Sequence, residues 1–279
     1  DWTRGFFSSM PARRGGPGPG RGPAPGGPTS GFAMHFYIRG PVLPTKFNAN
    51  QLREQLARFA DLERAIVEQR ALMDTFDPNR LWGLIVDEWG VWDAMDAAEE
   101  KQFGRLWMQS TMRTAVAGAL GLNVFHRQAD KLYMCNIAQT VNVLQSVILA
   151  HGNDCIRTST YYAFQMQKPH RGKIAVRAHT GDPSPLGLSV SASKGGGELV
   201  ATFVNPREDV HLKVNCGVTG AKLLSGKGQI LYHPDFNACN TFQNPDVLVP
   251  RDHPVTVEAS RLQFELPPIA IVSVVLRTA

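Results

Sequence analysis

The sequence predicts a mixed α/β region followed by an all-β region. Between Gly31 and about Ala150, short apolar runs alternate with longer helical patterns, which is typical of βα units that share a parallel sheet. In the rest of the chain, short alternating runs are separated by Gly, Pro, Asn and Asp, which indicates an antiparallel β-sandwich. We therefore expect domains at residues 31–156 and 157–279, after a separate segment at residues 1–30.

The segment at residues 1–30 is predicted to be flexible. Residues 11–30 are almost entirely Pro, Gly, Arg, Ala and Ser, so no large apolar side chain offsets the entropy cost of ordering them. The Arg-Gly content is similar to that of nucleic-acid-binding tails, but interleaved aromatic residues are missing. We therefore expect no nucleic-acid partner.

Three buried strands and three helices are expected in the α/β region. The strands are mostly apolar runs, and the helices show apolar residues at spacings of three and four. Strands are expected at residues 32–37, 81–86 and 131–135, and helices at about 50–76, 103–125 and 140–149. Three strands are too few to close a barrel or to protect both edges of an open sheet. Either the sheet is small or further strands of a barrel lie upstream.

The all-β region is predicted to contain at least six short strands, each with alternating apolar and polar residues. They are expected at residues 186–192, 198–204, 211–214, 229–232, 256–262 and 269–276.

Polar and aromatic residues gather at or just after the carboxyl ends of the three expected parallel strands. Active sites collect at this end of the strands in (β/α)₈ barrels, so this distribution favours the barrel interpretation. The residues are His35, Tyr37, Glu88, Trp92, Asn136 and Gln139.

Glu88 is the strongest candidate for a catalytic residue. It ends a buried strand and is followed by Trp89 and Trp92. Burial at such a position makes a charge costly, so hydrogen-bond donors or a function must account for it. The two tryptophans match the flat C–H face of a sugar ring, or they simply fill the core around a partly exposed Glu. Strand alternation directs Asp87 to the opposite face, where a structural role is expected.

Other polar residues can be grouped with Glu88 by strand phase. His35 and Tyr37 alternate onto the same side of their strand, which would place both in one pocket with Glu88, although a structural histidine is the alternative. The neutral amides of Asn136 and Gln139 suit sugar hydroxyls better than bond cleavage.

The composition excludes several classes of function. The chain has 43% hydrophobic and 19% charged residues, and its net charge of +5 comes from the stretch that precedes Glu54. It contains no Gly-rich phosphate loop, no Gly-x-Ser-x-Gly and no HExxH motif, which argues against phosphoryl transfer, serine hydrolysis and metalloprotease chemistry. Four widely spaced cysteines without a CxxC pair argue against zinc and predict free, buried thiols in a reducing compartment.

The sequence predicts a cytoplasmic protein without a membrane partner. No apolar run reaches the roughly 18 to 20 residues that cross a bilayer, and no secretory signal is visible. Because the chain begins at Asp1 rather than Met, we expect its natural start to lie upstream, which leaves secretion open.

Several stretches resemble the α-L-arabinofuranosidases of glycoside hydrolase family 51, in one colinear order from about Gly31 to the C-terminus. The specific ones are Leu84-Ile85-Val86-Asp87-Glu88-Trp89-Gly90-Val91-Trp92 and Asn136-Ile137-Ala138-Gln139-Thr140-Val141-Asn142-Val143-Leu144-Gln145. Shorter ones are Met34-His35-Phe36-Tyr37, Arg157-Thr158-Ser159-Thr160-Tyr161-Tyr162, Lys168-Pro169-His170 and Asn240-Thr241-Phe242.

The resemblance implies strands six to eight of a (β/α)₈ barrel followed by a β-sandwich, in a retaining enzyme without a cofactor. It implies that Glu88 is the nucleophile, that His35 and Tyr37 position it and the sugar, that Gln139 binds a sugar hydroxyl, and that Trp92 lines the cleft. The substrate would be an arabinofuranosyl-containing oligosaccharide or polysaccharide. The family is often hexameric, so a homo-oligomer is expected.

The chain departs from the family pattern in two ways. The family's acid/base Glu, in an Asn-Glu pair at the end of strand four, has no matching position, and residues 11–30 replace helical sequence. We therefore expect the isolated chain to be inactive. The alternative is a non-catalytic carbohydrate-binding or assembly module on the same scaffold.

Overall fold

The three expected parallel strands form one sheet in the computed structural model, which describes residues 2–9 and 30–279. Strands β1 (Ser30–Arg39), β2 (Trp82–Trp92) and β3 (Leu132–Ile137) pair in parallel in the order β1-β2-β3. Each strand is longer than its apolar run predicts, and β2 continues past Glu88 to Trp92.

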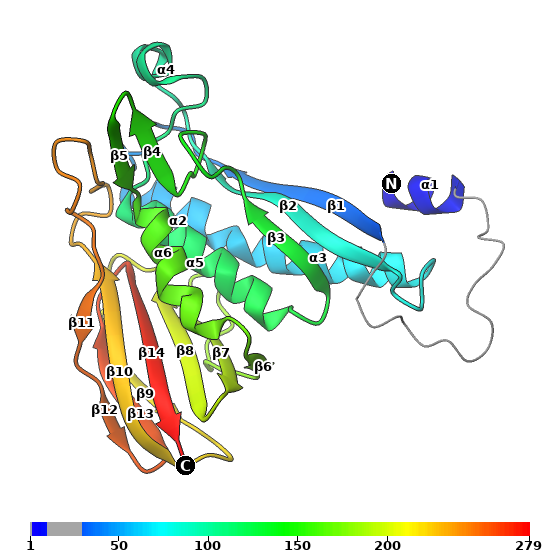
Figure 1. Ribbon diagram of the computed structural model, residues 1–279, viewed down its shortest axis with the longest axis vertical. Coiled ribbons are helices and arrows are strands. Elements are labelled where there is room, and N and C mark those ends of the chain that lie inside the picture. The colour runs from blue at the N-terminus through cyan, green and yellow to red at the C-terminus, as the bar shows by residue number, and fades with distance from the viewer. Residues whose placement is uncertain (1, 10–29) are drawn as a thin grey trace.

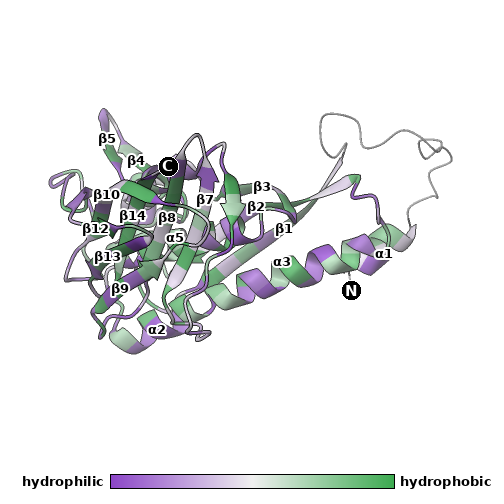
Figure 2. Ribbon diagram, turned by 90° about the horizontal axis from the view of Figure 1, so that it is seen from below, coloured by the Kyte–Doolittle hydropathy of each residue, from purple (hydrophilic) through white to green (hydrophobic). Residues whose placement is uncertain are grey.

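Two helices, rather than the single expected one, connect β1 to β2. Helix α2 (Ala49–Ala57) is capped at its N-terminus by Asn48, whose side chain forms a capping box with that of Gln51. Helix α3 (Phe59–Asp74) follows after Arg58. One face of α3 is buried through Phe59, Leu62, Ile66 and Met73. Hydrophilic and hydrophobic residues alternate along α3 beside the sheet, as the predicted apolar spacing requires (Figure 2).

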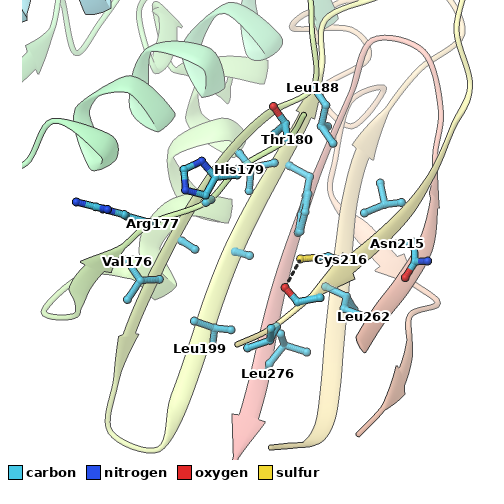
Figure 3. A pocket seen from close by; sticks show the side chains of 18 of the residues that line it. Val176, Arg177, His179, Thr180, Leu188, Leu199, Asn215, Cys216, Leu262 and Leu276 are labelled. Atoms are coloured by element: carbon cyan, nitrogen blue, oxygen red, sulfur yellow. Dashed lines mark hydrogen bonds between the residues drawn. The ribbon is translucent and has the colours of Figure 1, made fainter. Parts of the chain in front are cut away.

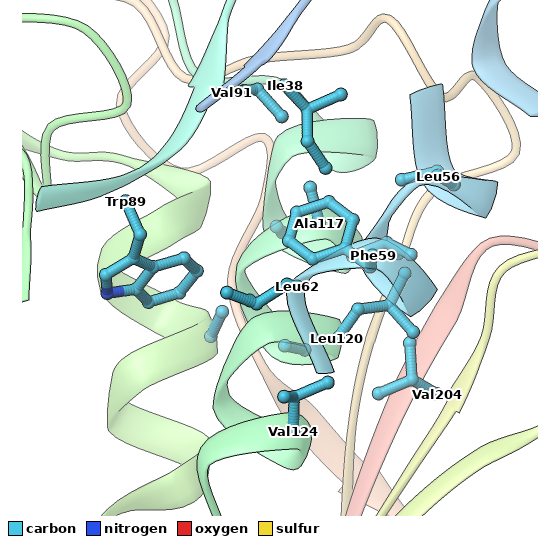
Figure 4. Packing of buried hydrophobic residues seen from close by; sticks show 14 of the residues in the cluster. Ile38, Leu56, Phe59, Leu62, Trp89, Val91, Ala117, Leu120, Val124 and Val204 are labelled. Carbon is cyan, nitrogen blue, oxygen red and sulfur yellow. The ribbon is translucent and has the colours of Figure 1, made fainter. Parts of the chain in front are cut away.

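Helix α5 (Met112–Arg127) lies between the parallel sheet and the β-rich part of the chain (Figure 1). It begins nine residues later than predicted because the preceding stretch forms a short helix, α4 (Ala97–Phe103), and a loop. Its sequence is rich in Ala and Gly and is buried on nearly all sides, so neighbouring elements approach it closely. Leu120 and Val124 of α5 pack with Trp89 of β2 and Leu62 of α3 (Figure 4).

The predicted helix at residues 140–149 is wrong. Asn142 and Leu144 have positive φ angles of 64° and 54°, and the chain enters an antiparallel hairpin of β4 (Ile148–His151) and β5 (Asp154–Arg157). The side chain of Asn142 donates to the carbonyl of Ala150 at 2.9 Å and accepts from its N–H at 2.7 Å. These contacts replace the backbone hydrogen bonds of a helix. The next helix is α6 (Ser159–Gln167), which the short 3₁₀ helix η1 (Lys168–His170) extends.

Part of the segment predicted to be flexible is instead helical. Helix α1 (Trp2–Ser9) packs Phe6 and Phe7 against Phe32 and Trp82 at ring distances of 5.2 to 5.8 Å. Packing of these aromatic rings stabilises the helix against the sheet. Residues 10–29, which include nearly all of the Pro/Gly/Arg-rich stretch, lie outside the described residues.

The C-terminal part forms two antiparallel sheets, as the alternating runs predict. One sheet has the strand order β11-β10-β14-β8-β7-β6 and the other has the order β12-β13-β9. The six-stranded sheet contains β6 (Ile174–Val176), β7 (Ser189–Gly195), β8 (Glu198–Asn205), β10 (Leu223–Tyr232), β11 (Arg251–His253) and β14 (Ala270–Thr278). The three-stranded sheet contains β9 (Leu212–Gly217), β12 (Thr256–Glu258) and β13 (Arg261–Leu266).

A continuous apolar core joins the two parts of the chain. Val204, Leu231 and Ile271 of the six-stranded sheet belong to the same buried cluster as Leu120 of α5 and Trp89 of β2. A second cluster lies between the two antiparallel sheets. The boundary between residues 156 and 157 stays a prediction.

Four cysteines are present as free thiols, as predicted, but they are less buried than expected. Cys155 is exposed, and Cys135, Cys216 and Cys239 are partly buried. Within residues 2–9 and 30–279, the structure contains no helix long and apolar enough to cross a membrane.

Candidate active site

A β-bulge at Asp87 shapes the carboxyl end of the parallel sheet. Met34 pairs with Val86, but the next residue of β1, His35, pairs with Glu88, so Asp87 is an extra residue on β2. The bulge interrupts strand alternation, and Asp87 and Glu88 both come close to His35. The prediction that Asp87 points to the opposite face is therefore wrong, because that prediction assumed a regular strand.

The carboxylate of Glu88 is held through one of its oxygens. The hydroxyl of Tyr37 donates a hydrogen bond of 2.7 Å to Oε2 of Glu88, and Nδ1 of His35 lies 3.5 Å from the same oxygen. Among the described residues, Oε1 of Glu88 has no such partner. The structure thus brings His35 and Tyr37 to Glu88, as their strand phase predicts.

Tyr37 acts as a hydrogen-bond donor in this group. Burial raises the pKa of its hydroxyl far above the ordinary value, and the hydrogen bond to Glu88 and the negative charges of Glu88 and Asp87 raise it further. The phenol therefore keeps its proton at any physiological pH. A protonated Tyr37 can donate a hydrogen bond that fixes the orientation of the carboxylate, and it adds no negative charge beside Glu88.

The two tryptophans of the motif have different surroundings. Trp92 is partly exposed, its ring meets Tyr37 edge-on at 5.3 Å, and the guanidinium of Arg39 lies 4.3 Å from its centroid. Trp89 is only 1% exposed and packs against Phe125 at 4.9 Å. Trp92 thus lies beside Tyr37, the residue that donates to Glu88, whereas Trp89 belongs to the core.

Gln139 and Asn136 lie at the same carboxyl-terminal end of the parallel strands but outside the group of residues around Glu88. Asn136 is an exposed residue of β3, and Gln139 follows two residues after that strand ends. The side chain of Gln139 is exposed, and its backbone N–H donates to the carbonyl of Val143 at 3.2 Å. The structure shows no contact between either amide and Glu88.

A fully buried polar network next to the carboxyl-terminal end of β2 was not predicted. Asp93, the residue after Trp92, forms an ion pair with Arg113 of α5, and both side chains are 0% exposed. Gln55 of α2 donates to Oδ1 of Asp93 at 2.7 Å and accepts from Arg113. Asp93 directly follows β2, and the residues around it in the sequence give no sign of this partner.

Gln145 is a second buried polar residue whose contacts were not predicted. Its side chain accepts a hydrogen bond from the N–H of Val91 at 2.8 Å and donates to the carbonyl of Thr114 at 2.7 Å. It therefore fastens the end of β2 to the start of α5. The mistaken helix at residues 140–149 concealed this role.

No described part of the chain offers a group of three or more His, Cys, Asp or Glu residues that could hold a metal ion. A hollow of about 760 Å³ lies between the antiparallel sheets, away from Glu88 (Figure 3). Aliphatic side chains such as Leu188, Leu199, Leu262 and Leu276 dominate its lining. Polar and charged residues also line the hollow, but Phe203 is the one Phe, Tyr or Trp among the described residues that line it, and that ring is buried. The hollow therefore lacks the open aromatic faces that match a sugar ring.

Comparison with known proteins identifies the class of the chain. Residues 87–270 match the family model described as the α-L-arabinofuranosidase C-terminal domain. An intracellular exo-α-L-arabinofuranosidase of Bacteroides ovatus is 30% identical over 269 residues, covering 88% of this chain and 51% of the relative. A probable α-L-arabinofuranosidase C of Aspergillus niger is 31% identical over 200 residues, covering 65% of this chain and 38% of the relative.

Solved structures agree with the sequence matches. The family 51 arabinofuranosidase of Xanthomonas axonopodis pv. citri superimposes with a TM-score of 0.82 at 28% identity, covering 89% of this chain and 53% of that one. The α-L-arabinofuranosidase of Thermotoga maritima, solved with arabinose, has a TM-score of 0.75 at 22% identity, covering 89% and 52%, and supports the fold alone.

These matches place the chain among the glycoside hydrolases. It belongs to family 51, the α-L-arabinofuranosidases, and contains the C-terminal domain of that family. The chain spans about half the length of the relatives it matches.

Proposed function

We propose that the full-length protein is a retaining, exo-acting glycosidase that releases terminal α-L-arabinofuranosyl groups from oligosaccharides or polysaccharides. One observation carries the proposal: the Glu88 carboxylate is held through Oε2 by Tyr37 and His35, which leaves Oε1 without a described partner. A carboxylate oriented in this way suits nucleophilic attack at an anomeric carbon. The named relatives support arabinofuranosides as substrates.

In the proposed first step, Oε1 of Glu88 forms a bond to the anomeric carbon while the bond to the leaving oxygen breaks. A second carboxylic acid gives its proton to that oxygen, and water later attacks the same carbon to release arabinose and restore Glu88. Retaining enzymes hold the two carboxyl groups about 5 to 5.5 Å apart. Tyr37 and His35 orient the nucleophile, Trp92 lines the cleft and Gln139 binds a sugar hydroxyl.

The isolated chain is proposed to be inactive. The carboxylate beside Glu88 in the described part of the chain is that of Asp87, which already contacts His35. Without a separate proton donor, about 10²- to 10⁴-fold of rate is typically lost. In the family arrangement, β1, β2 and β3 would be strands six to eight of a (β/α)₈ barrel, ahead of a β-sandwich. A homo-oligomer and a cytoplasmic location belong to the same proposal, and the intracellular relative supports the location.

The proposal is tested by kinetics on the complete gene product with an aryl α-L-arabinofuranoside. Glu88→Gln is expected to lower kcat by at least about 10³-fold, because an amide is a poor nucleophile. Glu68→Gln is the matched control, because Glu68 lies on α3 and its side chain is 71% exposed. Normal turnover by Glu88→Gln would refute the assignment of the nucleophile, and robust turnover by the 279-residue chain would refute its inactivity.

A further inference from the structure

Asp87 is a second carboxylate next to Glu88, and the bulge directs it to His35. Nε2 of His35 lies 3.2 Å from Oδ1 of Asp87, while Nδ1 of the same ring lies 3.5 Å from Oε2 of Glu88. The imidazole therefore bridges two carboxylates through its two nitrogens. A regular strand would have kept Asp87 away from this ring.

The Oδ1 atom of Asp87 is shielded from solvent although the side chain as a whole is 37% exposed. A shielded carboxylate oxygen needs a donor, since leaving one unpaired costs more than an ordinary hydrogen bond contributes. In the part of the chain that the structure describes, this oxygen makes no well-aligned hydrogen bond, and the ion-pair contact recorded for it is His35 Nε2. That contact fixes which ring nitrogen faces Asp87.

Each ring nitrogen of His35 faces a different carboxylate, so the contact at Nε2 and the contact at Nδ1 depend on one orientation of the ring. The titratable groups that face the ring are Asp87 and Glu88 from β2 and Tyr37 from β1.

We propose that Asp87 is a positioning residue that acts through His35 to orient the carboxylate of Glu88. Asp87 contacts Nε2 of the ring at 3.2 Å, which keeps Nδ1 facing Oε2 of Glu88 beside the hydroxyl of Tyr37. With the Tyr37 hydroxyl donating to Oε2 and the His35 ring beside the same oxygen, Oε1 is the oxygen presented to the sugar. This inference rests on the proposed function, in which Glu88 is the nucleophile.

The test is a double-mutant cycle between positions 87 and 35 in the complete gene product. Asp87→Ala is expected to lower kcat/KM for an aryl α-L-arabinofuranoside by about 10- to 100-fold, the range for losing one close contact to a charged group. The loss should fall on kcat more than on KM, because Asp87 acts through the orientation of the nucleophile and not through a contact of its own with the sugar. Asp87→Asn keeps an oxygen acceptor without the charge, so its activity should lie between wild type and Asp87→Ala.

A positioning role predicts that the two substitutions are not additive. In a His35→Ala background, Asp87→Ala should change kcat/KM by less than about threefold, because the ring through which it acts is gone. Asp130→Ala is the matched control. Asp130 lies before β3, at the amino-terminal end of the parallel strands, and its side chain is 66% exposed. Thermal unfolding of each variant reports whether the fold is retained.

Two results would overturn the proposal: an Asp87→Ala variant with wild-type kcat/KM, or effects of Asp87→Ala and His35→Ala that multiply. Both can occur while Glu88→Gln abolishes turnover, so this inference can fail without the proposed function. Conversely, if Glu88→Gln stays active, the proposed function fails whatever Asp87 does.

Discussion

We predict that Gly121→Ala lowers the stability of the protein, although helix propensity alone predicts an increase. Gly121 lies inside α5, where replacing Gly with Ala ordinarily stabilises a helix by about 0.5–1 kcal/mol. A Cβ at this position would lie 2.3 Å from Cζ3 of Trp89 and 2.9 Å from Cε3 and Cη2 of the same ring. Carbon atoms in contact are normally about 3.5–4.0 Å apart, so α5 or the ring would have to move by about 1 Å or more.

The ring of Trp89 has little room to move. Phe125 meets it edge-on at 4.9 Å, and Phe164 stacks on it at 6.2 Å. Overpacking of a filled core typically costs about 1–3 kcal/mol. After subtraction of the helix-propensity gain, we expect Gly121→Ala to lower the free energy of unfolding by about 1–2 kcal/mol, which corresponds to a drop in Tm of roughly 2–8 °C.

The assay is thermal and denaturant unfolding of the 279-residue chain, with Gly5→Ala as the control. Gly5 is also helical, in α1, but a Cβ there would meet no atom within 4 Å, so this variant should be as stable as wild type or more stable. If Gly121→Ala matched or exceeded wild-type stability, the close packing of α5 on β2 would be refuted.

Two further predictions concern buried charge. Burial lowers the pKa of His126 to about 4 and of His170 to about 3. Because both rings stay neutral in the folded state until the pH approaches 4, stability should fall as the pH drops from about 6.5 towards 4, by up to roughly 3 kcal/mol for each ring. Measured as Tm against pH, the slope should be shallower in His170→Gln, and an unchanged slope would contradict this account. Asp93→Ala leaves Arg113 buried without a counter-charge and should cost about 3–5 kcal/mol in unfolding experiments. Asp96→Ala, which removes a partly exposed helix cap, should cost about 1 kcal/mol, and equal losses would argue against the ion pair.

Much of the fold could be predicted because apolar periodicity reflects burial directly. The three parallel strands and the antiparallel sheets follow from it, and their observed ends lie mostly within a few residues of the expected ones. The helix predicted at residues 140–149 failed because its polar residues form tertiary contacts. Asn142 pairs with Ala150, and Gln145 reaches Val91 and Thr114, and no local pattern reveals these partners.

The candidate site was predictable as far as strand alternation holds. His35, Tyr37 and Glu88 come together because all three lie near the carboxyl ends of neighbouring strands, with His35 and Tyr37 in the same phase. Asp87 was misplaced because a β-bulge leaves no mark in the sequence, and Asp93 was missed because its partner lies 20 residues away on α5. The roles of Gln139 and Trp92 in binding sugar stay predictions.

The central claim is that Glu88 forms a covalent bond to the sugar, and trapping that bond tests it most directly. An arabinofuranosyl inactivator with fluorine at C2 and a good leaving group should label the complete gene product, because the first displacement outpaces the second. After trypsin digestion, the adduct should lie on the peptide from Leu81 to Lys101, and fragmentation should place it on Glu88 rather than on Asp87. An active enzyme labelled at another carboxylate, or not labelled at all, would contradict the account.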